Sequence, residues 1–477
     1  MLAQLIGFIL LPVYTRYLNP TDYGVIAMLA IIIAIFITVS GLGTNEAIFK
    51  YYRDIKINNN QLISNAFLIV LFSASFFLIF SLISSEFLFK LLLEDDTKNG
   101  LLMINLTLLI AFFMSLNSVF NSLIRAERRV KTALVVNITF VIVQVGISLV
   151  TIVVLGLGVI GMVLGQFFGQ ILVFIILVII TFKQYKFEVN KLLSKKMIRY
   201  GIYSVPTQIM DTIMNQLGQF MIKSTLTLKE SGLFAIATRI TEPIKIIGGS
   251  MRYAHSAFFF QILNEEKEPL RILRALASFY IALLTYLWVG VAVWGVEVLK
   301  VLTPVEFHSA HILIAPLSII PLLLIIYTFI SSGIDSGKDL KPYIFVNGVG
   351  LITYLTSLYY LLNEFGVIGA AYSTIITRLI MIVVSNYFSQ KRLKVPYNIL
   401  LIVLMISAGI IAIYINSFFY DENLKIRLFV EVLISLIFPI ICLIILLLFN
   451  TERNQIINRL KLIKINNYKI TITNNKK

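Results

Sequence analysis

Cysteine, tryptophan and histidine are all scarce in this 477-residue chain, which has one Cys, two Trp and three His residues. The single cysteine, Cys442, excludes an intrachain disulfide framework and a thiolate metal site, because each needs several thiols. Three histidines give little material for metal binding or acid–base catalysis. Walker loops, glycine-rich phosphate cradles and aspartate-rich motifs are also missing. The sequence therefore predicts no catalytic residue, no metal site, no cofactor and no enzyme.

Charged residues are scarce as well. They make up 13% of the chain, whereas 58% of the residues are hydrophobic and the mean hydropathy is +0.91. This composition is typical of an integral membrane protein, and no polar segment is long enough for a separate soluble domain. The net charge of +16 then reflects loop residues that set membrane orientation, so nucleic acid is not an expected partner.

Apolar stretches of about membrane-spanning length follow one another, separated by short polar breaks. They predict an all-α integral membrane protein with about fourteen transmembrane helices. Prolines at 12, 206 and 243 should kink or unwind three of these helices. The predicted spans are residues 2–18, 24–44, 62–84, 101–123, 132–155, 159–182, 200–226, 232–254, 275–302, 311–334, 342–362, 367–388, 398–419 and 427–449.

The basic residues are distributed unevenly over the breaks. Of the 40 Lys and Arg residues, 29 fall in alternate breaks, beginning with the break after the second span. The positive-inside rule places those breaks in the cytoplasm. We therefore expect a multi-pass protein with both termini in the cytoplasm and an even number of spans.

An internal duplication is visible in short matches. The segment Gly158–Gly161 (GVIG) recurs as Gly366–Gly369, 208 residues later, and the same offset places 23–27 on 231–235. Fixed-period similarity of this kind indicates a tandem repeat, here of six spans each. Because six is even, both repeats enter the membrane in the same orientation. Such parallel repeats predict two six-helix lobes around a central cavity, as in alternating-access transporters.

The repeat sets the expected domain boundaries. The N-terminal lobe should cover 1–190 and the C-terminal lobe 191–394, followed by helices 13 and 14 in 395–450 and a basic cytoplasmic tail in 451–477. The first span begins at Met1 without the basic lead that precedes its repeat partner near Tyr200, so we expect a truncated or misassigned start. It does not resemble a signal peptide, since a charged n-region and a small-residue cleavage site are missing.

The eighth span carries three charges near its middle: Arg239, Glu242 and Lys245. A charge at the bilayer centre costs roughly 2.5–3.5 kcal/mol, so three without partners would cost roughly 8–10 kcal/mol. Their i, i+3 spacing puts all three on one broad face. The offset of 208 aligns them with Ile31, Ala34 and Ile37, so the duplicated fold does not require the charges. We expect these three residues to face the substrate.

The seventh span has a polar stripe beside them, formed by Gln208, Asp211, Asn215 and Gln219. Spacings of three and four residues place the stripe on one helix face. In a membrane helix such a stripe forms a cavity wall or interhelical hydrogen bonds. Asp211 is also suited to a structural bridge to a base on the eighth span, and both interpretations are compatible.

Four other basic residues are candidates for the cavity. Arg16 ends the first span, Lys50 and Arg53 end the second, and Arg378 lies near the middle of the twelfth. The alternatives are an interfacial anchor for Arg16, a cytoplasmic cluster for Lys50 and Arg53, and a structural partner for an unidentified acid for Arg378.

Several short stretches resemble the bacterial polysaccharide-export flippases of the multidrug/oligosaccharidyl-lipid/polysaccharide exporter superfamily. These stretches are GFILLPVYTRYLNPTDYGVIAM (7–28), SGLGTNEAIFKYYRD (40–54), Arg-Ala-Glu-Arg at 125–128 and the repeated GVIG turns. The most specific part is Pro12…Arg16-Tyr17-Leu18…Tyr23-Gly24. The departures are the missing start of the first span and Lys50, where family members often have Arg.

The resemblance implies a V-shaped pair of six-helix lobes. It also implies transport of an undecaprenyl-diphosphate-linked oligosaccharide from the cytoplasmic to the outer leaflet of the bacterial cytoplasmic membrane, for O-antigen, capsule or exopolysaccharide assembly. In the related flippases of lipid-linked peptidoglycan precursors, basic residues on helices 1, 2, 7 and 8 face the cavity. Here Arg16, Lys50, Arg53, Arg239 and Lys245 lie on similar helices.

The expected partners are the lipid-linked oligosaccharide and membrane lipids, with a polysaccharide polymerase and a chain-length regulator as further candidates. Coupling to an H⁺ or Na⁺ gradient through an acidic residue is a further possibility. Two alternatives stay open: a multidrug or cation exporter of the same superfamily, and a membrane polymerase or acyltransferase. The exporter calls for acids dominating the cavity, and the enzyme for a large outer loop or a catalytic histidine.

Overall fold

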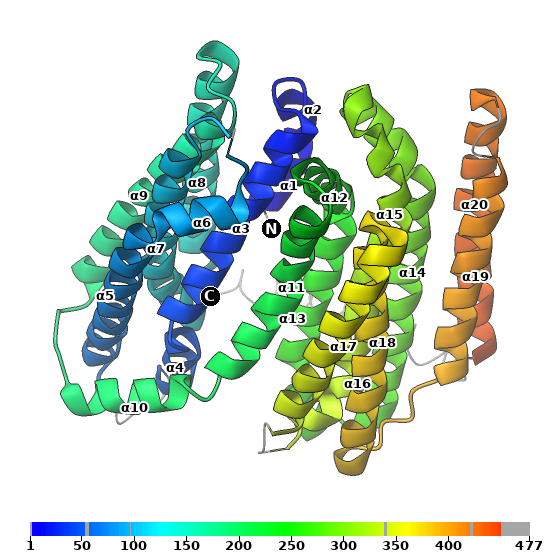
Figure 1. The fold of residues 1–477 in the computed structure, drawn as a ribbon. Helices are drawn as coiled ribbons and strands as arrows, with labels where there is room; N and C mark the ends of the chain where they lie inside the picture. Colours follow the sequence, from blue (N-terminus) through cyan, green and yellow to red (C-terminus); the bar gives the residue numbers. More distant parts are fainter. Residues whose placement is uncertain (1, 53–56, 96, 338–340, 420–422, 450–477) are drawn as a thin grey trace, which may run out of the picture. The chain divides into compact units, whose positions relative to one another are not determined.

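The computed structural model describes all residues except 1, 53–56, 96, 338–340, 420–422 and 450–477, so the predicted tail lies outside the described residues. Regular secondary structure in the described part is entirely helical (Figure 1), which confirms the all-α prediction. The helices are α1 (Leu2–Ile9), α2 (Leu11–Tyr14), α3 (Pro20–Ser40), α4 (Thr44–Tyr51), α5 (Asn59–Ile83), α6 (Ser85–Leu92), α7 (Gly100–Ala126), α8 (Val130–Leu149) with a π-helical end (Val150–Val154), α9 (Val159–Gln184), α10 (Lys191–Gly201), α11 (Val205–Thr225), α12 (Leu228–Ile240), α13 (Glu242–Glu265), α14 (Pro269–Leu302), a 3₁₀ segment (Val305–Ala310), α15 (His311–Ser318), α16 (Ile320–Asp335), α17 (Lys341–Phe365), α18 (Val367–Arg392), α19 (Ile399–Phe418) and α20 (Leu424–Phe449).

Eleven helical segments of the described chain are long and apolar enough to cross a membrane, which identifies a multi-pass membrane protein. They correspond to eleven of the fourteen predicted spans. Of the other three, 200–226 corresponds to the single helix α11, whereas 2–18 and 232–254 are each divided into two helices, so the prediction of a continuous helix is wrong there. The predicted span 311–334 is also divided, into α15 and α16. In each divided span a proline lies at the start of the second helix, as expected for a residue that lacks an N–H donor and clashes with the preceding turn.

The backbone supports the internal duplication. α9 and α18 begin and end 208 residues apart, at Val159 and Val367 and at Gln184 and Arg392. Each is preceded by a glycine with positive φ, 57° at Gly158 and 62° at Gly366. Residues with a Cβ rarely adopt such a conformation, so both repeats use glycine to make the same turn into the helix.

α3 and α12, also repeat partners, cross at a contact between their backbones. A Cβ added to Gly24 would overlap the carbonyl oxygen of Leu228, and a Cβ added to Gly232 would overlap that of Pro20. Gly24 and Gly232 are 208 residues apart, as are Pro20 and Leu228. The contact is therefore reciprocal, as in an isologous interface, and indicates a local pseudo-two-fold axis between α3 and α12.

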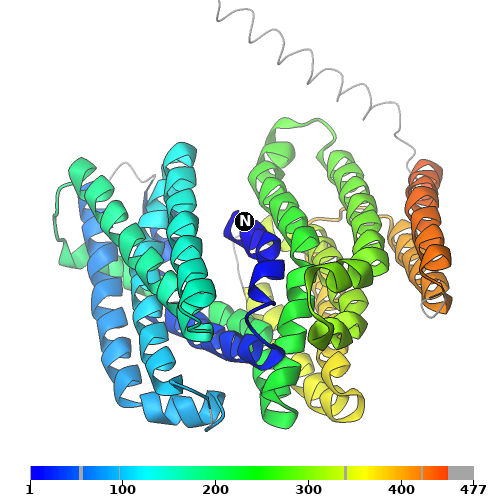
Figure 2. The ribbon, with the colours of Figure 1, turned by 90° about the horizontal axis from the view of Figure 1, so that it is seen from above.

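Contacts divide the chain into two compact units, which we describe separately. Unit 1 comprises 1–242, 297–313 and 343–377, and unit 2 comprises 243–296, 314–342 and 378–477. The predicted lobe boundaries at 190 and 394 stay a prediction. In unit 1, α5, α7, α8 and α9 form a bundle (Figure 2), and α3 packs against α7. The short α10, which the sequence analysis did not predict, packs against α4 and α5 (Figure 1).

In unit 2, α19 and α20 pack against each other, and both contact α14. The ring of Trp288 on α14 lies over Gly409 of α19, where a larger side chain would collide with it. Trp294, two turns further along α14, donates its indole N–H to the Ser435 hydroxyl of α20 at 2.7 Å. Such a hydrogen bond is favourable in an apolar surrounding because it satisfies the indole donor.

We predict that Gly232→Val lowers the stability of the protein by about 1–3 kcal/mol, because the added Cβ meets backbone that cannot move aside as a side chain can. Gly24→Val should have a similar effect, since its contact is the repeat-related one. Thermal unfolding in detergent, followed by size-exclusion chromatography, measures the change.

The matched control is Gly146→Ala on α8, where no heavy atom lies within 4 Å of the added Cβ. This variant should unfold at the wild-type temperature or above it, since alanine is the better helix former. Wild-type stability of both valine variants would show that the α3–α12 crossing is not a tight contact.

Candidate functional site

The candidate site begins at Arg239, in the last turn of α12. The residue is half-buried. Its guanidinium lies against α1, since a Cβ added to Gly7 would be 3.0 Å from Arg239 Nη1. Gly7 thus leaves the space that the guanidinium occupies. Arg239 lies seven residues, or about two turns, after Gly232, so it is on nearly the same face of α12 as the crossing with α3.

α12 ends at Ile240, and α13 begins at Glu242 after the single residue Thr241. Thr241 has φ −86° and ψ −4°, and its backbone N–H donates to the carbonyls of Ala237 and Arg239. The side chain of Glu242 is buried, with 7% of its surface exposed. A carboxylate in the first turn of a helix is stabilised by the helix dipole, which helps to explain an acid at this depth.

Lys245 and Arg378, two of the predicted cavity residues, belong to unit 2. Lys245 is exposed on α13, one turn after Glu242. Arg378 is half-buried on α18, and its guanidinium lies 3.6 Å from the sulfur of Met381, one turn further on. Their expected role in a shared cavity stays a prediction.

The polar stripe of α11 has two kinds of members. At its ends, Gln208 donates a hydrogen bond to the Ser204 hydroxyl at 3.1 Å, and Gln219 accepts one from the Ser231 hydroxyl of α12 at 2.7 Å. In its middle, Asp211 and Asn215 are exposed. The stripe therefore serves interhelical hydrogen bonding at one end and offers exposed polar groups in the middle, which suits both interpretations made from the sequence.

Lys50 lies at the end of α4, and its ammonium is 3.7 Å from the centre of the Tyr200 ring on α10. This cation–π contact follows from a close approach between the start of α4 and the end of α10, at Gly43 and Gly201. Arg16 is exposed in the turn between α2 and α3. Arg53 lies outside the described residues.

Sequence reasoning missed three residues that position this site: Gly7, Tyr200 and Ser231. Gly7 makes room for Arg239, Tyr200 covers Lys50, and Ser231 joins α12 to the stripe. Gly7 lies in an apolar stretch, where a glycine does not by itself indicate a neighbouring charged side chain. The offset of 208, which aligns Gly7 with Asn215 of the stripe, was the available clue.

The family-like segment Arg-Ala-Glu-Arg, 125–128, lies at the end of α7 and has a structural role. Glu127 accepts a hydrogen bond from the Tyr185 hydroxyl and forms an ion pair with Arg129 at 3.3 Å. Arg129 also donates to Gln184 at 2.7 Å. Burial and the adjacent carboxylate raise the pKa of Tyr185 above its usual range. These contacts join the ends of α7 and α9.

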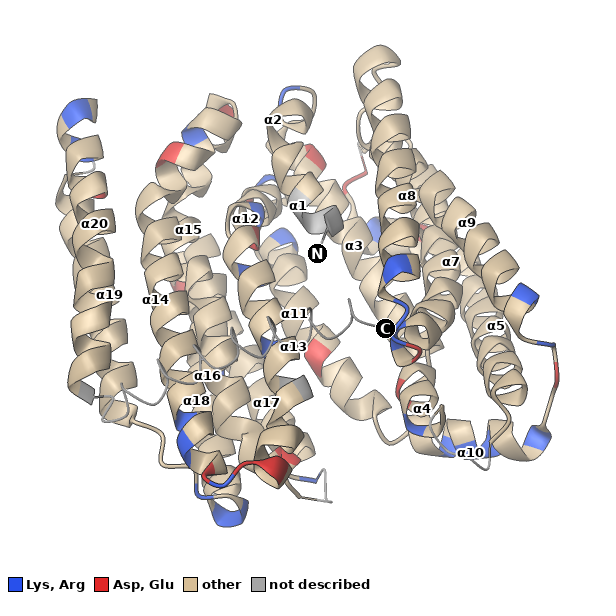
Figure 3. Ribbon diagram, turned by 180° about the vertical axis from the view of Figure 1, so that it is seen from behind, with Lys and Arg blue, Asp and Glu red and all other residues tan. Residues whose placement is uncertain are grey.

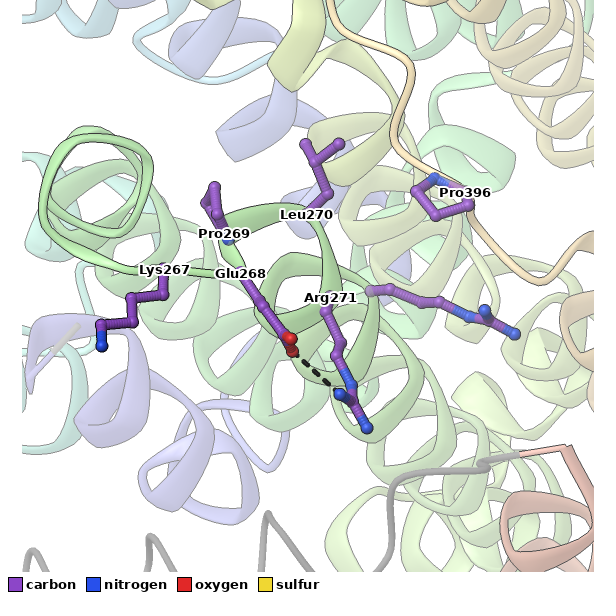
Figure 4. Close-up of a pocket in the computed structure, with 7 residues that line it drawn as sticks. Lys267, Glu268, Pro269, Leu270, Arg271 and Pro396 are labelled. Atoms are coloured by element: carbon purple, nitrogen blue, oxygen red, sulfur yellow. Dashed lines mark hydrogen bonds and ion pairs between the residues drawn. The ribbon is translucent and has the colours of Figure 1, made fainter.

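A cavity of about 560 Å³ lies in unit 2 at the turn before α14 (Figure 4). Its lining includes Lys267, Arg271 and Arg274, and Glu268 forms an ion pair with Arg271 at 2.8 Å. No predicted site residue lines it. Basic residues also occur on α10 and at the end of α18, at the positions coloured blue in Figure 3. Within the described ranges, no group of three or more His, Cys, Asp or Glu residues is placed to hold a metal ion.

Comparison with known proteins gives a family and a fold. The profile of a family described as polysaccharide biosynthesis protein matches residues 13–310. A solved structure of the lipid II flippase MurJ, in an inward closed conformation, superposes with a TM-score of 0.74 at 14% identity, covering 92% of this chain and 96% of that one. An inward-facing multidrug resistance MATE family transporter of the MOP superfamily gives 0.62 at 14% identity, covering 84% and 95%.

A structure of MATE in complex with MaD3S gives a TM-score of 0.60 at 15% identity, covering 85% of this chain and 94% of that one. No curated protein matches the chain. At these identities the structural likeness shows the fold alone. The chain thus has the fold shared by MurJ and the MATE transporters, which confirms the fold expected from the resemblance.

We predict that Asn215→Cys and Asp211→Cys, made in a Cys442→Ser background, react with a membrane-impermeant charged maleimide. A maleimide needs the thiolate, which forms in water and not in hydrocarbon. Labelling of the protein in intact membranes, read by mass spectrometry, measures the reaction.

Two controls separate water from lipid and from the protein interior. Phe72→Cys on α5 replaces a side chain that is 70% exposed on an apolar helix, and Met214→Cys replaces one that is 5% exposed. Both should stay unlabelled. Equal labelling at 72 and 215, or none at 211 and 215, would show that the stripe does not face water.

Proposed function

Because the chain belongs to the polysaccharide biosynthesis protein family, matched over residues 13–310, we propose that it is a flippase for undecaprenyl-diphosphate-linked oligosaccharides. It moves the repeat unit from the cytoplasmic to the outer leaflet by alternating access. The head of this substrate is a sugar chain on a diphosphate, which is too polar to cross hydrocarbon alone. A protein that transports it needs buried cations and hydrogen-bonding groups along the path.

One observation carries the proposal: Arg239 is held beside α1 at a position where the first repeat has Ile31. The α3–α12 crossing makes the two positions equivalent, so the scaffold folds with an apolar residue there. An arginine retained in a membrane helix is a functional-site candidate by default. Its guanidinium matches the geometry of phosphate oxygens and binds them with two hydrogen bonds.

The sugar head requires groups that accept and donate hydrogen bonds, in addition to the cations that bind the diphosphate. Asp211 and Asn215 are exposed at the middle of α11, and their oxygens and amide suit sugar hydroxyls. The sequence also predicts Arg16, Lys50, Arg53, Lys245 and Arg378 as basic residues that contact the substrate. Asp211 or Glu242 is the group through which an H⁺ or Na⁺ gradient drives release.

Alternating access needs rigid helices and a few places that change direction. The α3–α12 crossing supplies a rigid contact between the repeats. The interruptions at Leu10 and Thr241, each followed by a proline, divide spans that would otherwise be continuous. These interruptions serve as the hinges.

The second candidate is a multidrug exporter, since a MATE transporter shares the fold. Acids should then dominate the substrate path, because most such drugs are cations. Here six of the predicted site residues are Arg or Lys, and only Asp211 and Glu242 are acids. A membrane polymerase or acyltransferase has less support, because the three histidines give little material for catalysis and the solved structures that share the fold are those of a flippase and a transporter.

We place the protein in the bacterial cytoplasmic membrane with both termini in the cytoplasm, on the distribution of its basic residues. O-antigen, capsule and exopolysaccharide assembly are the processes that consume such a product. The expected protein partners are a polysaccharide polymerase and a chain-length regulator, which act on the repeat unit after it has crossed.

We predict that Arg239→Ala reduces export about 10- to 100-fold, as expected for loss of hydrogen bonds to a charged group worth about 1.5–3 kcal/mol. Surface polysaccharide in a complemented deletion strain measures export, and membrane yield of the protein shows that the variant inserts. The control is Lys229→Ala, at an exposed position in the first turn of the same helix. Full export by the Arg239 variant would remove the residue from the path.

Deletion of the gene should leave complete lipid-linked repeat units on the cytoplasmic leaflet. Analysis of lipid-linked oligosaccharides, with leaflet assignment by a membrane-impermeant glycosidase, measures this. Unpolymerised units on the outer leaflet would instead identify a polymerase, and a normal lipid profile with new drug sensitivity would identify an exporter.

A further inference from the structure

An apolar cavity of about 420 Å³, open on one side, lies within unit 1 and is lined by residues of α3, α5, α6, α7 and α11. We call it the α3/α11 cavity. Its lining is aliphatic and aromatic, with Ile31 and Ile35 on α3, Phe77 and Phe80 on α5 and Leu217 on α11 among its residues. The volume is within the roughly 300–1,000 Å³ typical of ligand sites.

The few polar residues of the lining do not change its character. Thr212 is one of them, and its hydroxyl forms a hydrogen bond of 2.8 Å with the Thr38 hydroxyl. The others are Ser81 and Gln216. A cavity with so little polar surface favours hydrocarbon over water or sugar.

α11 connects this cavity to the candidate site. Its residues Thr212 and Gln216 line the cavity, and each directly follows a residue of the polar stripe, Asp211 or Asn215. Consecutive residues differ by about 100° around a helix, and Asn215 lies about 60° from Thr212, so the polar edge of the cavity lining borders the stripe. A ligand that uses both faces has a hydrocarbon part next to a polar part.

A cation lies at the rim of the cavity. Lys223, one turn beyond the lining residue Phe220, donates a hydrogen bond from its ammonium to the carbonyl of Leu91 at 3.1 Å. The ammonium has two further N–H donors. On α6, Lys90 directly precedes Leu91, and both Lys90 and Glu86 are exposed. Lys223 therefore favours a ligand whose polar part is an anion.

The duplication relates the cavity to the position of Arg239. Ile31 lines the cavity, and Ile31 is the repeat equivalent of Arg239. The pseudo-two-fold contact between α3 and α12 thus relates an apolar position beside α11 to a charged position beside α1, which is itself the equivalent of α11. One scaffold presents hydrocarbon on one side of the crossing and a guanidinium on the other.

We propose that the α3/α11 cavity holds the hydrocarbon chain of the polyprenyl-linked substrate, while the diphosphate-sugar head lies against the polar face of α11. This inference rests on the proposed function. The occupant is one polyprenyl chain with an anionic head. The adjoining stripe of Asp211 and Asn215 matches a glycan head, which an ordinary phospholipid does not carry.

The test uses the full-length protein in liposomes of phosphatidylethanolamine and phosphatidylglycerol. The probe is undecaprenyl diphosphate with a photoreactive diazirine in its chain, and peptide mapping locates the labelled residues. Labelling should map to α5 and α11 residues of the cavity. Excess unlabelled undecaprenyl diphosphate should suppress it, and excess phosphatidylglycerol should not.

The variant Ser81→Trp fills the cavity with an indole. Losing the burial of about two methylene groups should reduce labelling about tenfold. The control Ile79→Trp makes the same change two residues away on α5, at a residue that is exposed and outside the lining, and should label as the wild type does. Both variants are compared at equal reconstitution, with monodispersity in detergent as the check of folding.

Each outcome separates the two proposals, because flipping of lipid-linked oligosaccharide by the wild type is measured in the same liposomes. Flipping with labels outside the cavity, or with unchanged labelling of Ser81→Trp, overturns this inference and leaves the proposed function in place. Competition by phosphatidylglycerol overturns it by showing a general lipid site. Labelling in the cavity without flipping supports a polyprenyl site and overturns the flippase.

Discussion

The contact on which unit 1 depends is the backbone approach of α3 and α12 at Gly24 and Gly232. Neither position has room for a Cβ, because each faces a carbonyl oxygen of the other helix. Small residues allow such close packing in membranes, where water supplies no hydrophobic force to hold helices together. Since the two glycines are repeat equivalents, the contact also fixes the local symmetry that makes residues of the two repeats comparable.

Because of that symmetry, the chemical difference between equivalent residues of the two repeats can be interpreted directly. Two turns from the crossing, α3 has Ile31 and α12 has Arg239. Ile31 lines an apolar cavity beside α11, and Arg239 lies against α1 at Gly7. Because the fold forms with an isoleucine at the equivalent position, it does not require an arginine at 239, and an arginine kept in a membrane helix indicates a functional role. The proposed substrate, with an anionic head and a hydrocarbon tail, is complementary to both surfaces.

Much of the fold could be predicted from the sequence, since apolar spans, prolines and repeated glycine turns act locally. The turns at Gly158 and Gly366, for instance, need only the backbone freedom of glycine. The division of the eighth span at Thr241 could not be placed, because Pro243 allows the interruption at several neighbouring residues. α6 and α10 were missed since short helices depend on tertiary packing more than on propensity.

The candidate site was predictable in its residue types and not in its partners. The charges of the eighth span and the stripe of the seventh stand out against apolar surroundings. The cation–π contact of Lys50 with Tyr200 and the hydrogen bond of Ser231 with Gln219 depend on how α10, α11 and α12 pack. The α3/α11 cavity has no sequence signature, because its lining residues are ordinary for membrane helices.

The central claim is that this chain by itself carries a lipid-linked oligosaccharide across a membrane. The most direct test is to reconstitute the purified protein in liposomes that contain a fluorescent undecaprenyl-diphosphate oligosaccharide. A membrane-impermeant glycosidase, added outside, cleaves only the outer-leaflet pool. The account predicts that the protein makes nearly the whole pool accessible, whereas protein-free vesicles stay at about half. A cleaved fraction equal to that of protein-free vesicles, with an ion gradient of either H⁺ or Na⁺ applied, would contradict the claim.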